Sequence, residues 1–257
     1  MEVLSIIVGI GILLIILERI YPDRVLPIVK GWWTRVIVIN IMQFAIVILG
    51  MYSWDLWFQG HQWYVLEKLF EGIPNFVLGF LGYLVITFVF YWWHRVRHES
   101  YFLWVTFHQL HHSASRLETI TSFYKHPLEI VLNSLLMGSI SYLLLGLNVE
   151  AVAWTVLYSS IGEYIYHMNI KTPHVMGYFF QRPEMHKIHH KEGVHTNNFS
   201  DLPLWDMLFG TYENPKACES DACGFSQDRE TQFTKILGFK NVNKPYIRSK
   251  KCTQKEQ

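Results

Sequence analysis

Histidines are concentrated in three short motifs of the sequence. They are HRVRH at 94–98, HQLHH at 108–112 and HKIHH at 186–190, and twelve of the thirteen histidines lie between positions 94 and 195. On a helix, residues three and four positions apart share a face, with Cβ atoms about 5–6 Å apart. We therefore expect each motif to point two or three imidazoles in the same direction.

Grouped imidazoles are typical ligands of iron, zinc, copper and nickel. The three motifs supply eight histidines, whereas a tetrahedral zinc site takes about four ligands. This surplus predicts either two metal ions or a coordination number above four. A single motif could equally be a solvated pair on a helix surface, but three of them together favour a metal centre.

Three further polar residues are candidates for work beside the histidines. Glu163 lies in an apolar run four residues before His167, so both share a helix face. An ionisable group at membrane depth suggests function, here as a metal ligand or as a partner orienting an imidazole. The alternative is an interfacial glutamate that faces water. Asn169 and Asp206 are candidate acceptors for imidazole N–H groups, or else helix caps or surface residues.

The elements that must position these residues are long apolar runs. A bilayer core takes about 20 apolar residues per helix. Five runs approach or reach that length, at 1–17, 36–54, 75–93, 128–147 and 149–166. The last two, separated by Asn148, form either two spans or a re-entrant hairpin. We predict an all-α integral membrane bundle of about four to five spans rather than a soluble protein with an apolar core.

The distribution of basic residues predicts which side the histidines face. The segment between the first two runs holds four basic residues, and the segment between the second and third holds only Lys68. Because basic loops stay in the cytoplasm, the third run should end at Trp93 on the cytoplasmic face. Residues 94–126 and 167–257 would then form a cytoplasmic, histidine-rich helical cap. The formal net charge of +1, without a long basic run, argues against nucleic acid as a partner.

The third motif has its own helix signals. In QRPEMHKIHHKEG, Pro183 suits a first helical position, Glu184 suits the first turn, and Gly193 is a stop signal. These residues predict a short helix of about two turns that carries the three histidines. The following DLPLWDMLFGT reads as a small amphipathic element that could cap the site.

The ordered motifs HRVRH, HQLHH and HKIHH, with about four spans, resemble the fatty acid hydroxylase / sterol desaturase superfamily. RPEMHKIHH followed by NNFSDLPLWDMLFGT is similar to the C-terminal signature of that superfamily. The resemblance covers residues 80–213. It implies a catalytic core there, within one membrane domain (1–257) that also contains an N-terminal anchor region (1–75) and a C-terminal cytoplasmic tail (214–257).

The resemblance also implies an activity and a ligand set. Relatives are membrane oxygenases that use two histidine-bound iron ions, which zinc can replace on purification, to hydroxylate or desaturate an aliphatic position of a sterol, fatty acyl or ether lipid with O2. Acyl hydroxylases carry an additional HxxxH, which here reads Glu163 to His167, so Glu163 stands where relatives have histidine. The metal ligands carried over are His94, His98, His108, His111, His112, His167, His186, His189 and His190. Weaker positions are His126, His174 and His195.

Oxygen chemistry needs electrons, and we find no flavin or nicotinamide fingerprint and no fused haem domain in the sequence. We therefore expect a separate electron donor of the cytochrome b5, ferredoxin or flavoprotein type. A bacterial inner membrane is favoured over the endoplasmic reticulum because the chain is short and lacks a retention signal. The alternatives are a catalytically inactive lipid-binding or scaffold relative, a membrane metal-handling protein, and a metal-dependent hydrolase with Glu163 or Glu184 as base.

Overall fold

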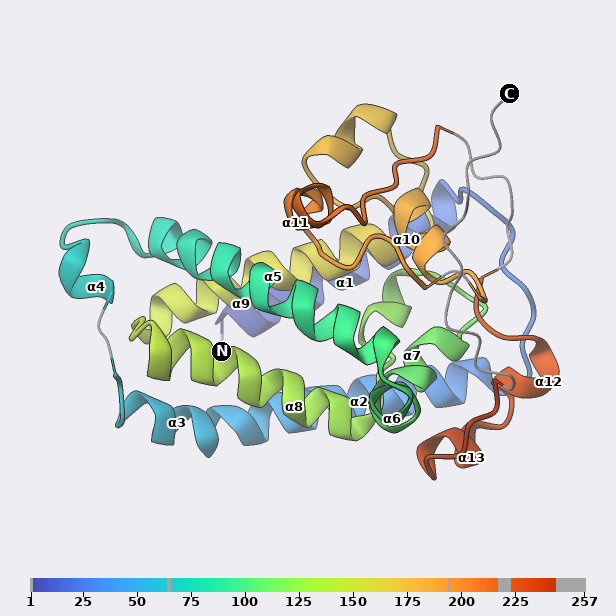
Figure 1. Cartoon of the computed structure of the whole chain (residues 1–257), viewed down its shortest axis with the longest axis horizontal. Helices are drawn as coiled ribbons and strands as arrows, with labels where there is room; N and C mark the ends of the chain where they lie inside the picture. The colour runs from blue at the N-terminus through green and yellow to red at the C-terminus, as the bar shows by residue number, and fades with distance from the viewer. Residues whose placement is uncertain (1, 64–65, 194, 217–222, 244–257) are drawn as a thin grey trace.

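The computed structural model of the chain describes residues 2–63, 66–193, 195–216 and 223–243, and these contain helices and no strand. Long helices run side by side along the longest axis of the molecule (Figure 1). They are α1 (Glu2–Ile20), α2 (Trp32–Met51), α5 (Asn75–Glu99), α8 (Pro127–Gly138) and α9 (Val149–His167). The predicted all-α class is confirmed.

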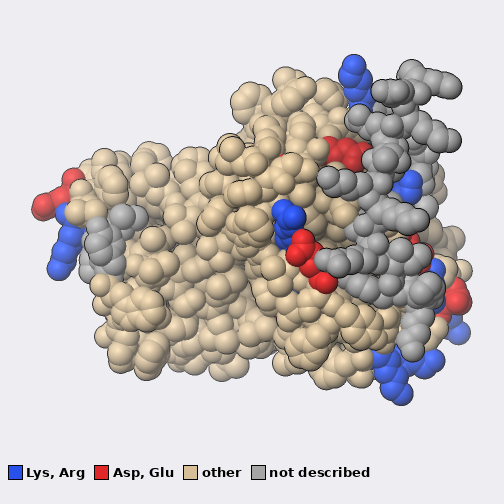
Figure 2. Space-filling model, viewed as in Figure 1, with Lys and Arg blue, Asp and Glu red and all other residues tan. Residues whose placement is uncertain are grey.

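Four helical stretches are long and apolar enough to cross a membrane. They are Glu2–Ile20, Trp32–Gln59 (which includes α3, Trp54–Gln59), Asn75–Glu99 and Pro127–Leu144 (which includes the π-helix η3, Ser139–Leu144). Helix α9 is not among them, but it packs along both α5 and α1. In Figure 2 a broad band without charged residues separates a small charged group at one end from many charges at the other. The protein is therefore a multi-pass membrane bundle.

Two buried glutamates tie the N-terminal helices to the remaining bundle. In α1, Glu18 Oε2 accepts the backbone N–H groups of Thr119 at 2.9 Å and Asn169 at 3.0 Å. Glu118 accepts hydrogen bonds from Arg19 and from the indole of Trp32. Because both carboxylates are fully buried, their hydrogen bonds hold α1 and α2 against the segment that follows the second histidine motif.

Helices α5 and α9 approach closely where α5 carries glycine. A Cβ atom on Gly79 would overlap Trp154 Cβ and lie 2.6 Å from the Ala151 carbonyl oxygen. The Thr155 hydroxyl donates to the Gly79 carbonyl oxygen at 2.9 Å. Small residues let membrane helices pack at such short range, and this contact holds α9, which carries His167 at its end, against α5.

Short helices cover the end of the bundle that carries the histidines (Figure 1). They are α10 (Pro183–His189), α12 (Gln227–Glu230) and α13 (Phe233–Leu237), while α11 (Pro203–Phe209) lies beside α5. Helix α10 starts at Pro183, and Gly193 follows it with a φ of +80°, so the short helix predicted there is confirmed. Of the tail predicted at 214–257, residues 217–222 and 244–257 lie outside the described residues. Within 223–243, Ile236 is buried against Trp32 and Leu110.

The glycine contact yields the first prediction. Replacing Gly79 by alanine should lower the free energy of unfolding by about 1–3 kcal/mol, because the new methyl group overpacks the α5–α9 contact. The control is Gly9→Ala in α1, where a Cβ meets nothing within 4 Å. Thermal unfolding in detergent would compare the two variants. Equal midpoints would contradict the close-packing account.

Candidate metal centre

The first histidine motif lies on the end of a long continuous helix. Sequence reasoning ended the third span at Trp93, whereas α5 continues through His94 and His98 to Glu99. One helical turn separates these two histidines, and their ring centroids are 5.1 Å apart. The second motif begins on the π-helix η1 (Trp104–His108) and continues on α7 (Gln109–Ser113).

Nine histidines from α5, η1, α7, α9, and α10 with its C-cap residue His190 come together in two groups. In each group, one ring nitrogen from every member lies within 4.8 Å of the corresponding nitrogens of all the others. The first group is His94, His98, His108, His112 and His189, and the second is His111, His167, His186 and His190. These are the nine residues that the sequence analysis singled out as ligands.

Each HxxHH motif contributes to both groups, which the sequence analysis did not expect. His108 and His112 belong to the first group while His111 belongs to the second. In the third motif the assignment is reversed, because only His189 belongs to the first group. Successive helical residues are about 100° apart, so the two adjacent histidines of a motif diverge. Our expectation that each motif points two or three imidazoles the same way therefore holds for two of them. His108 and His112 share one group, His186 and His190 share the other, and the third histidine of each HxxHH motif faces the opposite group.

Hydrogen bonds to carbonyl oxygens determine which nitrogen of the key histidines carries the proton. His94 Nδ1 lies 2.7 Å from the Phe199 carbonyl oxygen, and His189 Nδ1 lies 2.8 Å from that of Asn197. A carbonyl oxygen only accepts, so each Nδ1 carries a proton and each neutral Nε2 has a lone pair. Yet these two Nε2 atoms are 3.0 Å apart. Two lone pairs at that distance repel unless a cation lies between them.

The second group repeats this arrangement. His167 Nδ1 lies 2.8 Å from the Glu163 carbonyl oxygen, His111 Nδ1 lies 3.3 Å from that of Tyr124, and the two Nε2 atoms are 3.3 Å apart. Burial lowers the pKa of His111 well below its usual value and that of His189 to about 3. Extra protons are therefore a poor source of the positive charge, and a bound metal ion in each group fits the donor set.

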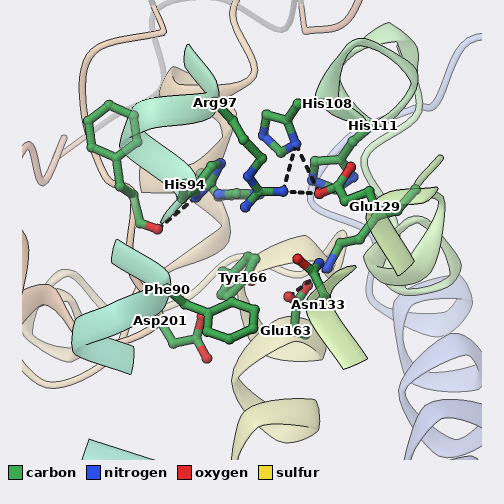
Figure 3. A pocket seen from close by; sticks show the side chains of 13 residues that line it. Phe90, His94, Arg97, His108, His111, Glu129, Asn133, Glu163, Tyr166 and Asp201 are labelled. Carbon is green, nitrogen blue, oxygen red and sulfur yellow. Dashed lines mark hydrogen bonds and ion pairs between the residues drawn. The ribbon is translucent and has the colours of Figure 1, made fainter. Parts of the chain in front are cut away.

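A buried carboxylate orients the second motif. Glu129 of α8 accepts from Arg97 of α5, and its Oε1 lies 3.1 Å from His108 Nδ1. Figure 3 shows the Arg97 side chain reaching towards Glu129, with the His108 ring beside both. Glu129 is fully buried and Arg97 is 4% exposed. Carboxylate partners of this kind hold a ligand imidazole in one orientation.

Asp206 acts on the site through a loop rather than through an imidazole. Its carboxylate accepts the backbone N–H groups of Phe199 at 2.8 Å and Ser200 at 3.0 Å, and the hydroxyl of Thr211 at 2.7 Å. Within the described residues, the Asp206 carboxylate accepts from these groups and not from a histidine, which was the first of the two roles considered for it. Instead, Asp206 fixes the loop whose Phe199 carbonyl oxygen accepts from His94.

Glu163 lies beside the second group but turns its carboxylate away. Its Oε1 accepts from Lys125 Nζ at 2.7 Å, and its Oε2 is 3.8 Å from His167 Nδ1. The backbone carbonyl of Glu163, not its side chain, orients the His167 imidazole. In the first group, His94 and His98 are two ligands four residues apart on one helix. In the second group, the residue four positions before His167 is Glu163, so a carboxylate stands where the first group has a histidine.

The weaker candidates separate into one residue near the groups and three away from them. His195 lies with its ring centroid 4.8 Å from that of His112. His126 instead caps α8, where its side chain accepts the Leu128 N–H. His174 Nε2 lies 3.3 Å from the Asn214 carbonyl oxygen. The Asn169 side-chain amide donates to the Arg24 carbonyl oxygen. Helix capping and loop closure account for these three.

A cavity of about 30 Å³ lies among α5, α8 and α9 beside both groups. Sequence reasoning missed most of its charged lining. The lining comprises Lys125 together with four residues labelled in Figure 3, namely Arg97, Glu129, Glu163 and Asp201. The available signal was the presence of ionisable residues at the ends of apolar runs. The cavity has room for about one or two molecules the size of water.

The chain belongs to the fatty acid hydroxylase family, whose model matches residues 79–211, just over half of the 257 residues. It is 31% identical over 150 residues to the ornithine lipid hydroxylase of Rhizobium tropici, covering 57% of this chain and 45% of that protein. It is 27% identical to sphinganine C4-monooxygenase 2 of Arabidopsis thaliana, covering 60% of this chain and 61% of that one.

A third relative extends the match along this chain. Alkylglycerol monooxygenase of Danio rerio is 28% identical over 201 residues, which cover 77% of this chain and 41% of that protein. The matches therefore span about two fifths to three fifths of these relatives. No solved structure matches the chain.

The Arg97–Glu129 pair yields the second prediction. Glu129→Gln should lower the free energy of unfolding by about 3–5 kcal/mol, because it leaves a buried guanidinium without its anionic partner. The matched control is Glu99→Gln, which breaks the exposed Arg95–Glu99 pair and should cost less than about 1 kcal/mol. Thermal unfolding in detergent measures both. Similar losses of stability in the two variants would show that the burial of Glu129 does not raise the cost of removing its charge.

Proposed function

We propose that this protein is an integral-membrane non-haem di-iron oxygenase that hydroxylates or desaturates an aliphatic C–H position of a lipid. The observation that carries the proposal is the convergence of nine histidines, eight of them buried, into two groups with facing Nε2 atoms. Two groups support two metal ions. Family membership supports iron as the metal, and zinc is the ion we expect to replace it on purification.

Iron bound there would supply the O2-dependent oxidation of an unactivated C–H bond, which no side chain can perform. The protein contributes ligands and their orientation. The histidines of the two groups would hold the ions, while Glu129 and the carbonyl oxygens of Phe199 and Asn197 keep the imidazoles aligned. Burial of the groups excludes bulk water and keeps the ligand nitrogens free of protons.

The substrate class follows from the surroundings of the site. The histidine groups lie at one end of a bundle of apolar helices, so an aliphatic chain in the bilayer can approach from the side. The names of the relatives refer to ornithine lipid, sphinganine and alkylglycerol, which supports a lipid substrate. Electrons would come from a separate donor protein of the cytochrome b5, ferredoxin or flavoprotein type.

We place the histidine end of the bundle in the cytoplasm and favour a bacterial inner membrane. In the described chain, Lys68 is the basic residue of the connection between α3 and α5, whereas Arg19, Arg24, Lys30 and Arg35 lie at the opposite end. This asymmetry supports the assignment because basic loops remain cytoplasmic. We retain the division into an anchor (1–75), a catalytic core (80–213) and a tail (214–257) within one domain.

Metal content provides the third prediction and the main test. The purified wild type should hold about two metal ions per chain, because the donor set forms two groups. His189→Ala and His111→Ala should each reduce that content, since one residue belongs to each group. His61→Ala, an exposed residue of the opposite end, is the control. Mass spectrometry of bound metal gives the count.

Two outcomes of that measurement have opposite meanings. A stoichiometric loss in the two group variants, together with O2-dependent lipid oxidation by the wild type, would support the proposal. A wild type without stoichiometric metal would overturn it and favour an inactive lipid-binding or scaffold protein.

We further propose that the Glu163 carboxylate transfers a proton beside the second group. Its carboxylate is held by Lys125 next to the cavity that both groups line, and the reduction of O2 consumes protons. Glu163→Gln should therefore lower the turnover rate by about 10²–10⁴-fold while the metal content stays that of the wild type. Turnover and metal content would be measured on the same preparation. Loss of one metal ion would instead identify Glu163 as a ligand.

A further inference from the structure

Two short segments of the C-terminal half form an exposed apolar surface, which we call the apolar lip. The segments are 174–180, which contains the 3-10 helix η4 (His174–Tyr178), and 203–209, which is α11. Their only Asp, Glu, Lys or Arg residue is the buried Asp206. The exposed side chains of the lip include Tyr178, Phe179, Phe180, Leu204, Leu208 and Phe209.

The lip is packed against a membrane-spanning part of α5. The Trp205 indole donates to the Thr87 hydroxyl at 2.9 Å, and the Phe209 ring centroid is 4.8 Å from that of Trp92. Arg95 is the first charged residue of α5, eight positions after Thr87. At a rise of about 1.5 Å per residue, Thr87 lies about 12 Å deeper than Arg95 along the helix. Helix α11 therefore sits beside the apolar stretch of α5, below its charged end.

The two segments of the lip are in contact with each other, and hydrogen bonds of flanking residues hold them together. The Tyr212 hydroxyl donates to the Gly177 carbonyl oxygen at 3.1 Å, and the Gln181 N–H donates to the Asp201 carbonyl oxygen at 2.9 Å. Figure 1 shows α11 and the gold segment of η4 projecting sideways from α5 rather than beyond its end. Phe88 and Trp92 of α5 are partly exposed beside them, so the apolar surface is continuous.

We propose that the apolar lip is embedded among the lipid chains of the bilayer leaflet on the histidine side. Its position level with the apolar part of α5 and its lack of surface charge match lipid. A short amphipathic element that buries its apolar face at the membrane boundary is a known kind of membrane contact. A protein partner of transient electron-transfer type would be steered by complementary charges, which this surface does not offer. The distribution of basic residues alone instead predicts a cytoplasmic position for both segments.

The embedded lip would set the depth in the bilayer at which the histidine groups lie. Asp206 lies on α11 and holds the backbone of Phe199, whose carbonyl oxygen accepts from His94. The lip is thus connected, through these two hydrogen bonds, to one imidazole of the first group. For the proposed oxygenase, this depth selects which carbon atom of a lipid chain reaches the histidine groups. That consequence rests on the proposed function, whereas the membrane contact does not.

Photocrosslinking tests the contact without any requirement for activity or metal. A benzophenone amino acid would replace Leu208 or Phe179, which are 62% and 66% exposed, in the full chain reconstituted into vesicles with radiolabelled phosphatidylcholine. The positive control is Ile12, exposed on the spanning helix α1, and the negative control is the exposed Lys235 of α13.

Labelling at both lip positions should match that at Ile12 and exceed that at Lys235. Lipid adducts no more abundant than at Lys235, or adducts to a second copy of the chain in place of lipid, would overturn the proposal. Size-exclusion elution of each variant confirms folding before illumination, and two independent positions guard against a local defect. Because the readout is lipid attachment, its failure is distinguishable from failure of the oxygenase proposal.

Discussion

The structure depends on one constraint, which is that unprotonated imidazole nitrogens are held close together although their lone pairs repel each other. The carbonyl oxygens of Phe199 and Asn197 hold the Nδ1 protons of His94 and His189, so their Nε2 lone pairs face each other at 3.0 Å. Such an arrangement is unfavourable unless positive charge is supplied between the nitrogens. The surrounding bundle must therefore both force the imidazoles together and leave a place for cations.

Several parts of the fold serve this requirement. The glycine contact between α5 and α9 holds α9, which carries His167 at its end, against α5. The Glu129 carboxylate, paired with Arg97, controls the position of His108 from within the apolar bundle. These polar groups are tolerable at that depth because they are paired and hydrogen-bonded.

Much of this architecture could be predicted from local patterns. Apolar runs located the spanning helices, and Pro183 and Gly193 delimited the short helix of the third motif, because these signals depend on neighbouring residues only. The nine histidines were also found, since spacing along a helix reveals shared faces. Their division into groups of five and four was not, because it depends on how α7 and α10 face each other.

Sequence alone thus determined the kinds of side chain available and the helices that carry them. Tertiary structure decided their partners. Asp206 accepts a hydrogen bond from the backbone of the loop at Phe199 rather than from an imidazole, and the Glu163 carboxylate accepts from Lys125. Tertiary structure also brought α11 alongside the apolar part of α5. These outcomes rest on contacts between residues distant in the chain, which no local propensity or spacing encodes, because the packing of whole helices sets them.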